Sequence, residues 1–236
     1  MRLWSLYRVF VANAITRARV VGFLCVGAVL LAIALGLRSV NPVDAVLNAG
    51  LYLDLASLRM AIPVAALVFG TATIGDSLDD GTYVYLWLRP SPRWQITFAA
   101  FAATVTGVVP LVGIPSVVGA WLIDPSPEVL IGAVGSVSLS ILAYSALFVM
   151  FGHLTQRGLI WGIGYLLIVE QFISAGGAGL GFITVHSHAV SFVARVLKVD
   201  LPTDYFGLAM ATVSPLAFTG LFLGISVVRQ RRMTVP

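Results

Sequence analysis

The chain has 236 residues, of which 59% are apolar and only 10% are charged, and its 14 Lys and Arg side chains outnumber the 10 Asp and Glu. A soluble domain has roughly 45–50% apolar and about 25% charged residues, so the composition excludes an ordinary soluble domain. Disordered chains are poor in apolar residues, and strands of membrane barrels alternate in polarity, which argues against both classes. The composition therefore predicts an all-α polytopic membrane protein, and Cys25, the single cysteine, excludes a disulfide framework.

Residues 1–19 predict an amphipathic helix that lies in the membrane interface, with a frayed terminal arm as the alternative. Apolar side chains recur there every three or four residues: Leu3, Leu6, Tyr7, Phe10, Val11, Ala14 and Ala18. Arg8, Arg17 and Arg19 fall largely on other faces, where they would meet anionic headgroups. A cleaved signal peptide usually has an apolar region of about 7–15 residues, shorter than the run from Val20 to Leu37, so we expect a retained helix.

Six apolar runs have about the 20 residues that a helix needs to cross a bilayer. They cover approximately residues 20–37, 58–75, 96–121, 129–151, 159–178 and 206–228. The third run contains Pro110 and Pro115, which predict a kink because each proline removes a helical hydrogen bond. Residues 20–236 are therefore expected to form one membrane domain with six transmembrane helices.

The basic residues predict the orientation of these spans. With six spans both chain ends share a side, and that side holds ten arginines, whereas the other side holds Arg38, Arg59, Arg195 and Lys198. Because basic residues concentrate in cytoplasmic loops, both termini are expected in the cytoplasm. The arginines are spread over membrane flanks, so we expect no binding to nucleic acid.

The cytoplasmic loop between the second and third spans, residues 76–94, combines charged and aromatic side chains. Asp79 and Asp80 suit the start of a short helix, and Arg89 with Pro90 suits its end. An apolar face on such a loop indicates docking onto a membrane or a partner. That face would be formed by Tyr83, Leu86 and Trp87.

Two interpretations of this loop remain open from its residues alone. Asp79, Asp80, Arg89 and Arg93 offer charge-assisted bonds across a protein interface, and the loop's aromatic residue types are enriched in interface hot spots. Alternatively, the arginines bind lipid headgroups and the aromatics form part of a membrane belt.

The stretch D-D-G-T-Y-V-Y-L-W-L-R-P-S-P-R-W-Q-I, residues 79–96, resembles a segment of bacterial type-2 ABC exporter permeases. The matching positions are Asp80, Gly81, Thr82, Leu86, Arg89, Pro90, Arg93 and Ile96. The location between spans two and three, the six-span layout and the amphipathic leader are also similar to that family. Family members often carry more charged residues ahead of the Gly-Thr, where this chain has Ile74-Gly75-Asp76-Ser77.

In that family the segment forms the coupling element that rests on the ATPase subunit. The resemblance therefore implies ATPase-coupling roles for Asp79, Asp80, Gly81, Thr82, Tyr83, Leu86, Trp87, Arg89 and Arg93. It also implies a cytoplasmic ABC ATPase subunit, a second permease that is identical or homologous, and ATP and Mg bound by the ATPase partner. This chain has no G-x-x-x-x-G-K-[ST] motif around Lys198, its only lysine, so we expect no cofactor in the chain itself.

Glu170 is the only acidic residue deep in a predicted span. The segment G-Y-L-L-I-V-E-Q-F-I-S, residues 164–174, looks like the fifth span of many such permeases. A charge near the centre of a span costs roughly 2.5–3.5 kcal/mol on insertion, so it usually faces a partner or a cavity. Glu170 and Gln171 are therefore the transport-path candidates, and the alternative is a structural pairing of Glu170 with Gln171, Arg59 or the backbone.

After the fifth span, residues 179–205 form the predicted outer loop. Residues 186–201 predict a short amphipathic helix, which would be either a lid over the exit or a simple cap; in the resembled family this region forms short helices that dip into the outer leaflet. Gly158-x-x-x-Gly162 and Gly220-x-x-x-Gly224 allow close helix approach, within one chain or across a dimer.

We expect no enzyme active site and no metal site in this chain. Ser136, Ser138 and Ser140 lack a G-x-S-x-G context, and no histidine has a carboxylate at metalloprotease spacing. His186 and His188 are interpreted as an exposed surface pair, because two such residues cannot close a metal site alone.

The sequence predicts the permease subunit of an ATP-driven ABC exporter in the bacterial cytoplasmic (inner) membrane. It would act as a dimer of permeases, surrounded by membrane lipid, and move a hydrophobic or amphipathic compound of the drug or lipid type. A non-transporting scaffold or sensor subunit that docks a soluble partner, and a secondary transporter, remain alternatives.

Overall fold

The computed structural model describes residues 3–40, 44–79, 92–155, 157–173 and 177–232, and within these ranges every regular element is a helix. The α-helices and the wider π-helical segments, labelled η, are α1 (Leu3–Ala14), α2 (Arg17–Val40), α3 (Ala45–Tyr52), η1 (Leu53–Ala61), α4 (Ile62–Asp79), α6 (Arg93–Val108), η2 (Val109–Gly113), α7 (Ile114–Ile123), α8 (Pro127–Leu154), α9 (Gly158–Tyr165), η3 (Leu166–Ile173), α10 (Ala178–Gly181), α11 (Val185–Leu197) and α12 (Leu208–Arg232).

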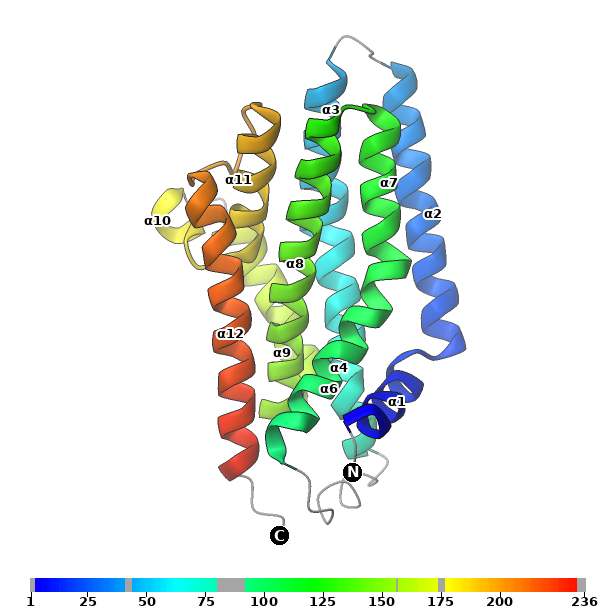
Figure 1. Cartoon of the computed structure of the whole chain (residues 1–236), viewed down its shortest axis with the longest axis vertical. Helices are drawn as coiled ribbons and strands as arrows, with labels where there is room; N and C mark the ends of the chain where they lie inside the picture. Colours follow the sequence, from blue (N-terminus) through cyan, green and yellow to red (C-terminus); the bar gives the residue numbers. More distant parts are fainter. Residues whose placement is uncertain (1–2, 41–43, 80–91, 156, 174–176, 233–236) are drawn as a thin grey trace.

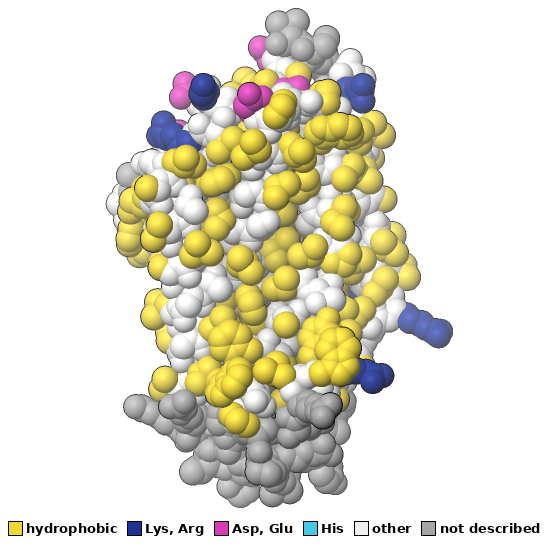
Figure 2. Space-filling view, in the orientation of Figure 1, with side chains coloured by type: hydrophobic (Ala, Val, Ile, Leu, Met, Phe, Trp, Pro, Cys, Tyr) yellow, Lys and Arg dark blue, Asp and Glu magenta, His cyan; other side chains and the backbone are white. Residues whose placement is uncertain are grey.

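Five of the described helices are long and apolar enough to cross a membrane. They run over Arg17–Ser39, Ala45–Thr73, Trp94–Ile123, Pro127–Leu154 and Leu208–Gln230. On the face shown in Figure 2, apolar side chains cover the middle of the molecule and charged side chains lie toward its two ends. The prediction of a helical membrane protein is confirmed at this level.

The predicted fifth span is a shorter helix among the described residues. The run expected over residues 159–178 ends as a helix at Ile173, and the whole of Gly158–Ile173 has fewer than 18 residues. A helix of that length falls short of the roughly 20 residues of a full span. Figure 1 shows that the chain continues from this helix through α10 into α11, beside α8 and α12.

Two of the long helices and the shorter helix Gly158–Ile173 contain a π-helical segment. η1 ends two residues before Pro63, and η2 contains Pro110, with Pro115 further on in α7. Proline has no N–H and clashes with the carbonyl four residues earlier, so the helix must widen or bend there. The irregularity predicted for the third span is therefore present, and a similar one occurs in the second span.

The second span starts earlier than predicted. The sequence placed it at about residue 58, whereas the helix begins at Ala45 and continues through η1 into α4. Asp54 consequently lies inside the span, with its side chain fully buried. The prediction that Glu170 is the only acidic residue deep in a span is therefore wrong.

The helix predicted at the N-terminus is present as α1 (Leu3–Ala14), is shorter than residues 1–19, and packs against protein. Leu6, Phe10 and Ala14 are fully or almost fully buried. Leu6 and Phe10 share a small apolar cluster with side chains of α6 and α8: Ile96, Ala99, Ala100, Ala103 and Val149. Figure 1 shows α1 at the end of the molecule where α4 ends and α6 begins.

Helix α8 is the centre of the molecule and contacts α4, α6, α7, α9, α11 and α12. Glycines allow these close approaches: a Cβ on Gly135 would lie 2.3 Å from the Phe192 ring of α11, and one on Gly162 would lie 2.2 Å from Leu67 of α4. The pair Gly158 and Gly162 is thus used within the chain. Gly220 and Gly224 have open space where a Cβ would be, so no described residue packs closely against them.

Candidate functional site

The structure gives limited information on the predicted coupling residues. Asp79 is the last residue of α4 and Arg93 is the first residue of α6. The other seven, Asp80, Gly81, Thr82, Tyr83, Leu86, Trp87 and Arg89, lie outside the described residues, as does the short helix expected there. What is described is the frame around them, in which α1 packs on α6 just after the segment and the Tyr7 and Thr106 hydroxyls lie 2.9 Å apart.

Glu170, on η3, binds the beginning of α11. Its side chain is 3% exposed. The backbone N–H groups of Val185 and His186 donate to its two carboxylate oxygens at 3.1 and 3.3 Å, and the Tyr165 hydroxyl donates at 2.8 Å. The first N–H groups of a helix have no partner inside the helix and carry partial positive charge, so a buried carboxylate is a strong acceptor for them.

These contacts of Glu170 agree with the structural alternative in part. The carboxylate bonds to the backbone and to Tyr165, whereas Arg59 pairs with Asp54. The side chain of Gln171 is only partly buried. In this structure Glu170 binds the beginning of α11. The role of Glu170 in a transport path stays a prediction.

A second carboxylate lies close by, and sequence reasoning missed it. Asp54 on η1 accepts a hydrogen bond from His186 Nε2 at 2.8 Å, and Arg59 NH2 lies 3.6 Å from the same oxygen. The side chains of Asp54 and His186 are 0% and 1% exposed. His186 therefore contacts both carboxylates, Asp54 through its ring and Glu170 through its backbone N–H.

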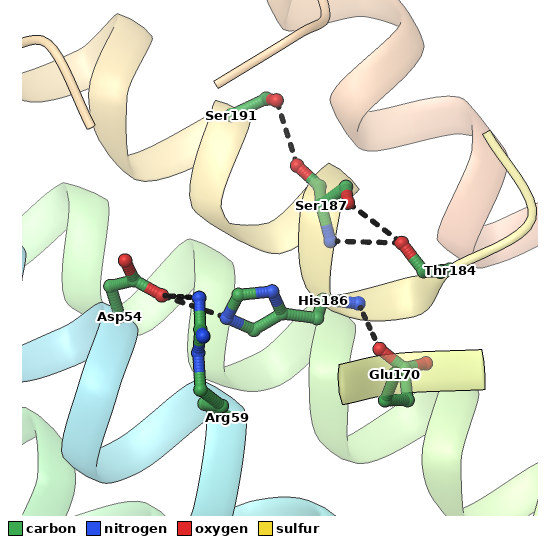
Figure 3. A network of polar contacts seen from close by, with 7 residues as sticks. All are labelled: Asp54, Arg59, Glu170, Thr184, His186, Ser187 and Ser191. Atoms are coloured by element: carbon green, nitrogen blue, oxygen red, sulfur yellow. Dashed lines mark hydrogen bonds and ion pairs between the residues drawn. The ribbon is translucent and has the colours of Figure 1, made fainter. Parts of the chain in front are cut away.

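Hydroxyl groups along α11 extend this set of polar contacts, as Figure 3 shows. We call the seven residues drawn there the polar cluster: Asp54, Arg59, Glu170, Thr184, His186, Ser187 and Ser191. Thr184 caps α11 by accepting from the Ser187 N–H at 3.4 Å, and the Ser191 hydroxyl donates to the Ser187 carbonyl at 2.7 Å. Such side-chain caps satisfy N–H groups at a helix start that would otherwise be unpaired.

The far end of α11 is fixed to the connection that leads into α12. Ser191 Oγ accepts from the N–H groups of Tyr205 and Phe206 at 3.1 and 3.2 Å, and Arg195 Nε donates to the Phe206 carbonyl at 3.1 Å. Arg195 also lies 3.2 Å from Asp204. Burial raises the pKa of Asp204, and the nearby Arg195 guanidinium opposes that rise.

The two histidines of α11 are buried, so their interpretation as an exposed surface pair is wrong. His188 is fully buried, bonds through Nε2 to the Phe182 carbonyl at 3.0 Å, and stacks on the Phe206 ring with centroids 4.5 Å apart. The two side chains therefore have different partners. Among the described residues no group of three or more His, Cys, Asp or Glu could hold a metal ion.

Several polar atoms in the cluster have no hydrogen-bond partner among the described residues. They are Asp54 Oδ2, Arg59 Nε, His186 Nδ1 and, nearby on η1, Ser57 Oγ. Buried polar atoms are normally paired, and an unpaired one usually has a structural or functional reason. The polar cluster therefore contains buried polar atoms that its own side chains do not satisfy.

The predicted outer loop, residues 179–205, contains the helix α11, most of whose residues are buried. A Cβ on Gly132 would lie 2.4 Å from Leu197, so α11 packs closely against α8 here too. The expected short helix is therefore confirmed, although it begins at Val185 and ends at Leu197.

No family model matches this chain, and no curated protein matches it in sequence.

Proposed function

We propose that this chain is the membrane subunit of an ATP-driven exporter, in which a separate cytoplasmic ABC ATPase hydrolyses ATP with Mg. The observation that carries the proposal is the segment of residues 79–96, which resembles the coupling segment of bacterial type-2 ABC exporter permeases. Two such permeases, identical or homologous, would assemble with two ATPase chains in the bacterial cytoplasmic membrane. The cargo proposed is a hydrophobic or amphipathic compound of the drug or lipid type.

The frame around the segment supports this role. The segment connects α4, which packs on the central helix α8, with α6, which packs on both α8 and α1. A movement imposed on residues 80–91 would therefore be passed to two membrane helices and to the interfacial helix together. Rigid helices that share packed side chains move as a unit, so such a loop is a suitable point for a partner to act.

Copurification is the first test. The chain is tagged in its native host, extracted gently, and the proteins that copurify in stoichiometric amounts are identified. The proposal predicts a soluble chain with a G-x-x-x-x-G-K-[ST] motif, and a second six-span chain beside it would make the permease pair a heterodimer. A homo-oligomer without any ATPase would contradict the proposal and favour a scaffold or a secondary transporter.

Two variants test the loop itself. Gly81→Pro removes the φ freedom of glycine and one N–H, and Arg89→Glu reverses a charge expected to face the partner. Both are expected to lower transport-linked ATPase activity while membrane insertion stays intact. Arg38→Glu, placed by the topology on the opposite side of the membrane, is the matched control and should leave that activity unchanged. Full activity in both loop variants would contradict the coupling role.

One observation favours a second candidate, a secondary transporter driven by an ion gradient. Three ionisable side chains, those of Asp54, Glu170 and His186, are buried close together, and Asp54 lies on a helix long enough to cross a membrane. Buried ionisable groups in membrane segments are typical of proton relays. Cargo flux that follows a proton gradient in ATP-free vesicles would support this candidate, and flux that needs ATP would exclude it.

A further inference from the structure

An open groove runs between the beginning of α6 and the end of α12. The residues that line it are all uncharged: Trp94, Phe98, Gly220, Leu223, Gly224, Val227 and Val228. Its volume is about 460 Å³, within the range of roughly 300–1,000 Å³ that is typical of ligand sites. The Trp94 and Phe98 rings pack edge to face with their centroids 6.0 Å apart. The groove therefore has an aromatic wall on α6 and a second wall on α12.

Two glycines make the α12 wall flat. Gly220 and Gly224 are exposed, and a Cβ added to either would meet no atom within 4 Å. Their spacing of four residues puts them on one face of the helix. From Gly220 to Val228 the helix advances by about 12 Å, close to the roughly 15 Å of hydrocarbon in one leaflet. The groove thus has the length of one leaflet's acyl-chain region.

The groove ends at a basic edge of the molecule. Arg229 directly follows the last lining residue and is exposed. α12 ends with Arg231 and Arg232, and α6 begins with Arg93. Neither helix contains an aspartate or a glutamate. Figure 1 shows the beginning of α6 and the end of α12 at the same end of the molecule. An apolar groove that ends beside arginines is complementary to a lipid with an anionic headgroup.

We propose that this groove binds one phospholipid with an anionic headgroup, taken from the leaflet around this end of the molecule. One acyl chain lies along Gly220 and Gly224 against the Phe98 ring, and the phosphate binds Arg229. Trp94 lies at headgroup level, where tryptophans of membrane proteins are enriched. Lipid tails are as apolar as the groove, so the acyl chain gains only packing contacts, and the arginine supplies the preference for an anionic lipid.

A helix of a second copy of the chain fits the charges less well. Open glycines four residues apart suit a partner helix as well as an acyl chain. Two copies in one membrane share their orientation, however, and a symmetric pair formed through this groove would bring the basic ends of both α12 helices together. Like charges that face each other across an interface are unfavourable, whereas a phosphate has the opposite sign.

Native mass spectrometry of the full chain tests this proposal without any ATPase partner. The chain is purified in a neutral detergent, stripped of lipid, and mixed with phosphatidylglycerol or phosphatidylcholine that have identical acyl chains. The proposal predicts a complex with one phosphatidylglycerol, whose occupancy exceeds that of phosphatidylcholine at least about fivefold, as expected for one arginine near a membrane surface. Equal occupancies of the two lipids would contradict the proposal.

Three variants separate the groove from its basic edge. Gly224→Leu fills the groove and should remove most of the phosphatidylglycerol complex. Arg229→Gln leaves the groove open and should lower the preference for phosphatidylglycerol over phosphatidylcholine. Gly22→Leu is the matched control, because a Cβ on this α2 glycine also meets nothing within 4 Å, and it should bind as the original chain does. Unchanged thermal unfolding midpoints would show that the two leucine variants keep their fold.

Fluorescence of Trp94 gives an independent measurement in lipid nanodiscs, with its share of the signal identified through Trp94→Phe. Phosphatidylglycerol with brominated acyl chains should quench Trp94 more strongly than brominated phosphatidylcholine at the same mole fraction, and Gly224→Leu should remove the difference. A difference that survives in Gly224→Leu would overturn the proposal. A dimer of the chain that dissociates in Gly224→Leu would also overturn it, because the groove would then hold a second copy.

Discussion

Two short helices, α1 and α11, lie against the long helices at opposite ends of the molecule and are held there by different forces. α1 is fixed mainly by apolar side chains, since Leu6 and Phe10 enter a cluster formed by α6 and α8. α11 also packs on α8, but its beginning is fixed by two buried carboxylates, Asp54 and Glu170. Apolar packing does not depend on pH and has no directional requirement. Buried hydrogen bonds need a defined geometry, and a buried donor or acceptor without a partner costs free energy. The position of α1 thus depends mainly on apolar packing, whereas the position of α11 depends in addition on specific buried hydrogen bonds.

The largest effect is expected at the carboxylate that holds α11. Glu170→Ala removes the acceptor of three donors, the Tyr165 hydroxyl and the N–H groups of Val185 and His186. Leaving buried donors without a partner should lower the free energy of unfolding in detergent micelles by about 3–5 kcal/mol. Glu170→Gln keeps one carbonyl oxygen and should lose much less. Equal losses in the two variants would show that volume, and not hydrogen bonding, holds α11.

The next effect is expected at the apolar anchor of α1. Phe10→Ala empties a fully buried site between α1, α6 and α8 and should cost about 3 kcal/mol, near the lower limit for such truncations. Hydrogen exchange should then speed up over residues 3–14 by the same factor at every pH. Val9→Ala, at a site that is 37% exposed, is the control and should change little. A pH-dependent loss would remove the contrast between the two helices.

A glycine substitution measures how much apolar packing contributes to α11. Gly135→Leu places side-chain atoms where the Phe192 ring of α11 lies, which should destabilise the chain by about 2 kcal/mol. Gly220→Leu is the matched control, because nothing lies near that position in the chain, and should be close to neutral in micelles. If Gly135→Leu cost more than Glu170→Ala, α11 would be held mainly by packing, as α1 is.

The smallest effect concerns a polar contact between α1 and α6. Tyr7→Phe removes the hydrogen bond with Thr106 at 2.9 Å, which is exposed, and should cost only about 0.5 kcal/mol. The rate of exchange over residues 3–14 would show it as an increase of roughly twofold to threefold. A loss comparable with that of Phe10→Ala would mean that α1, too, depends on polar bonds.

The long helices could be predicted because membrane spans are a local property of the sequence. Uninterrupted apolar runs located the four helices around residues 20–37, 96–121, 129–151 and 206–228 to within a few residues. The second span was placed too late because Asp54, Ser57 and Arg59 lower the local hydropathy, although the helix passes through them. The fifth was made too long because its apolar run continues into glycines beyond the end of the helix.

The polar cluster could not be predicted because its contacts join distant parts of the chain. His186 and Asp54 are 132 positions apart, and the local sequence around either residue does not indicate that the two are in contact. Glu170 was identified from its cost in a membrane, but its partners, the first N–H groups of α11, are backbone atoms that any sequence would have. A useful signal was present in the apolar leucines around Asp54, at positions 51, 53, 55 and 58, which extend the pattern of the span upstream.

The π-helical segments also determine how the chain tolerates changes in its length. A wider turn accommodates an additional residue, so the loss of one residue between Leu53 and Ala61 would let the segment rewind as an ordinary α-helix. The residues on either side of the deletion would then keep nearly the same relative orientation, because the wider turn had already absorbed the additional residue. In an ordinary α-helical stretch, the same deletion would rotate the two sides by about 100° relative to each other. The π-helical segment therefore makes this part of the helix more tolerant of a one-residue deletion than its α-helical neighbours.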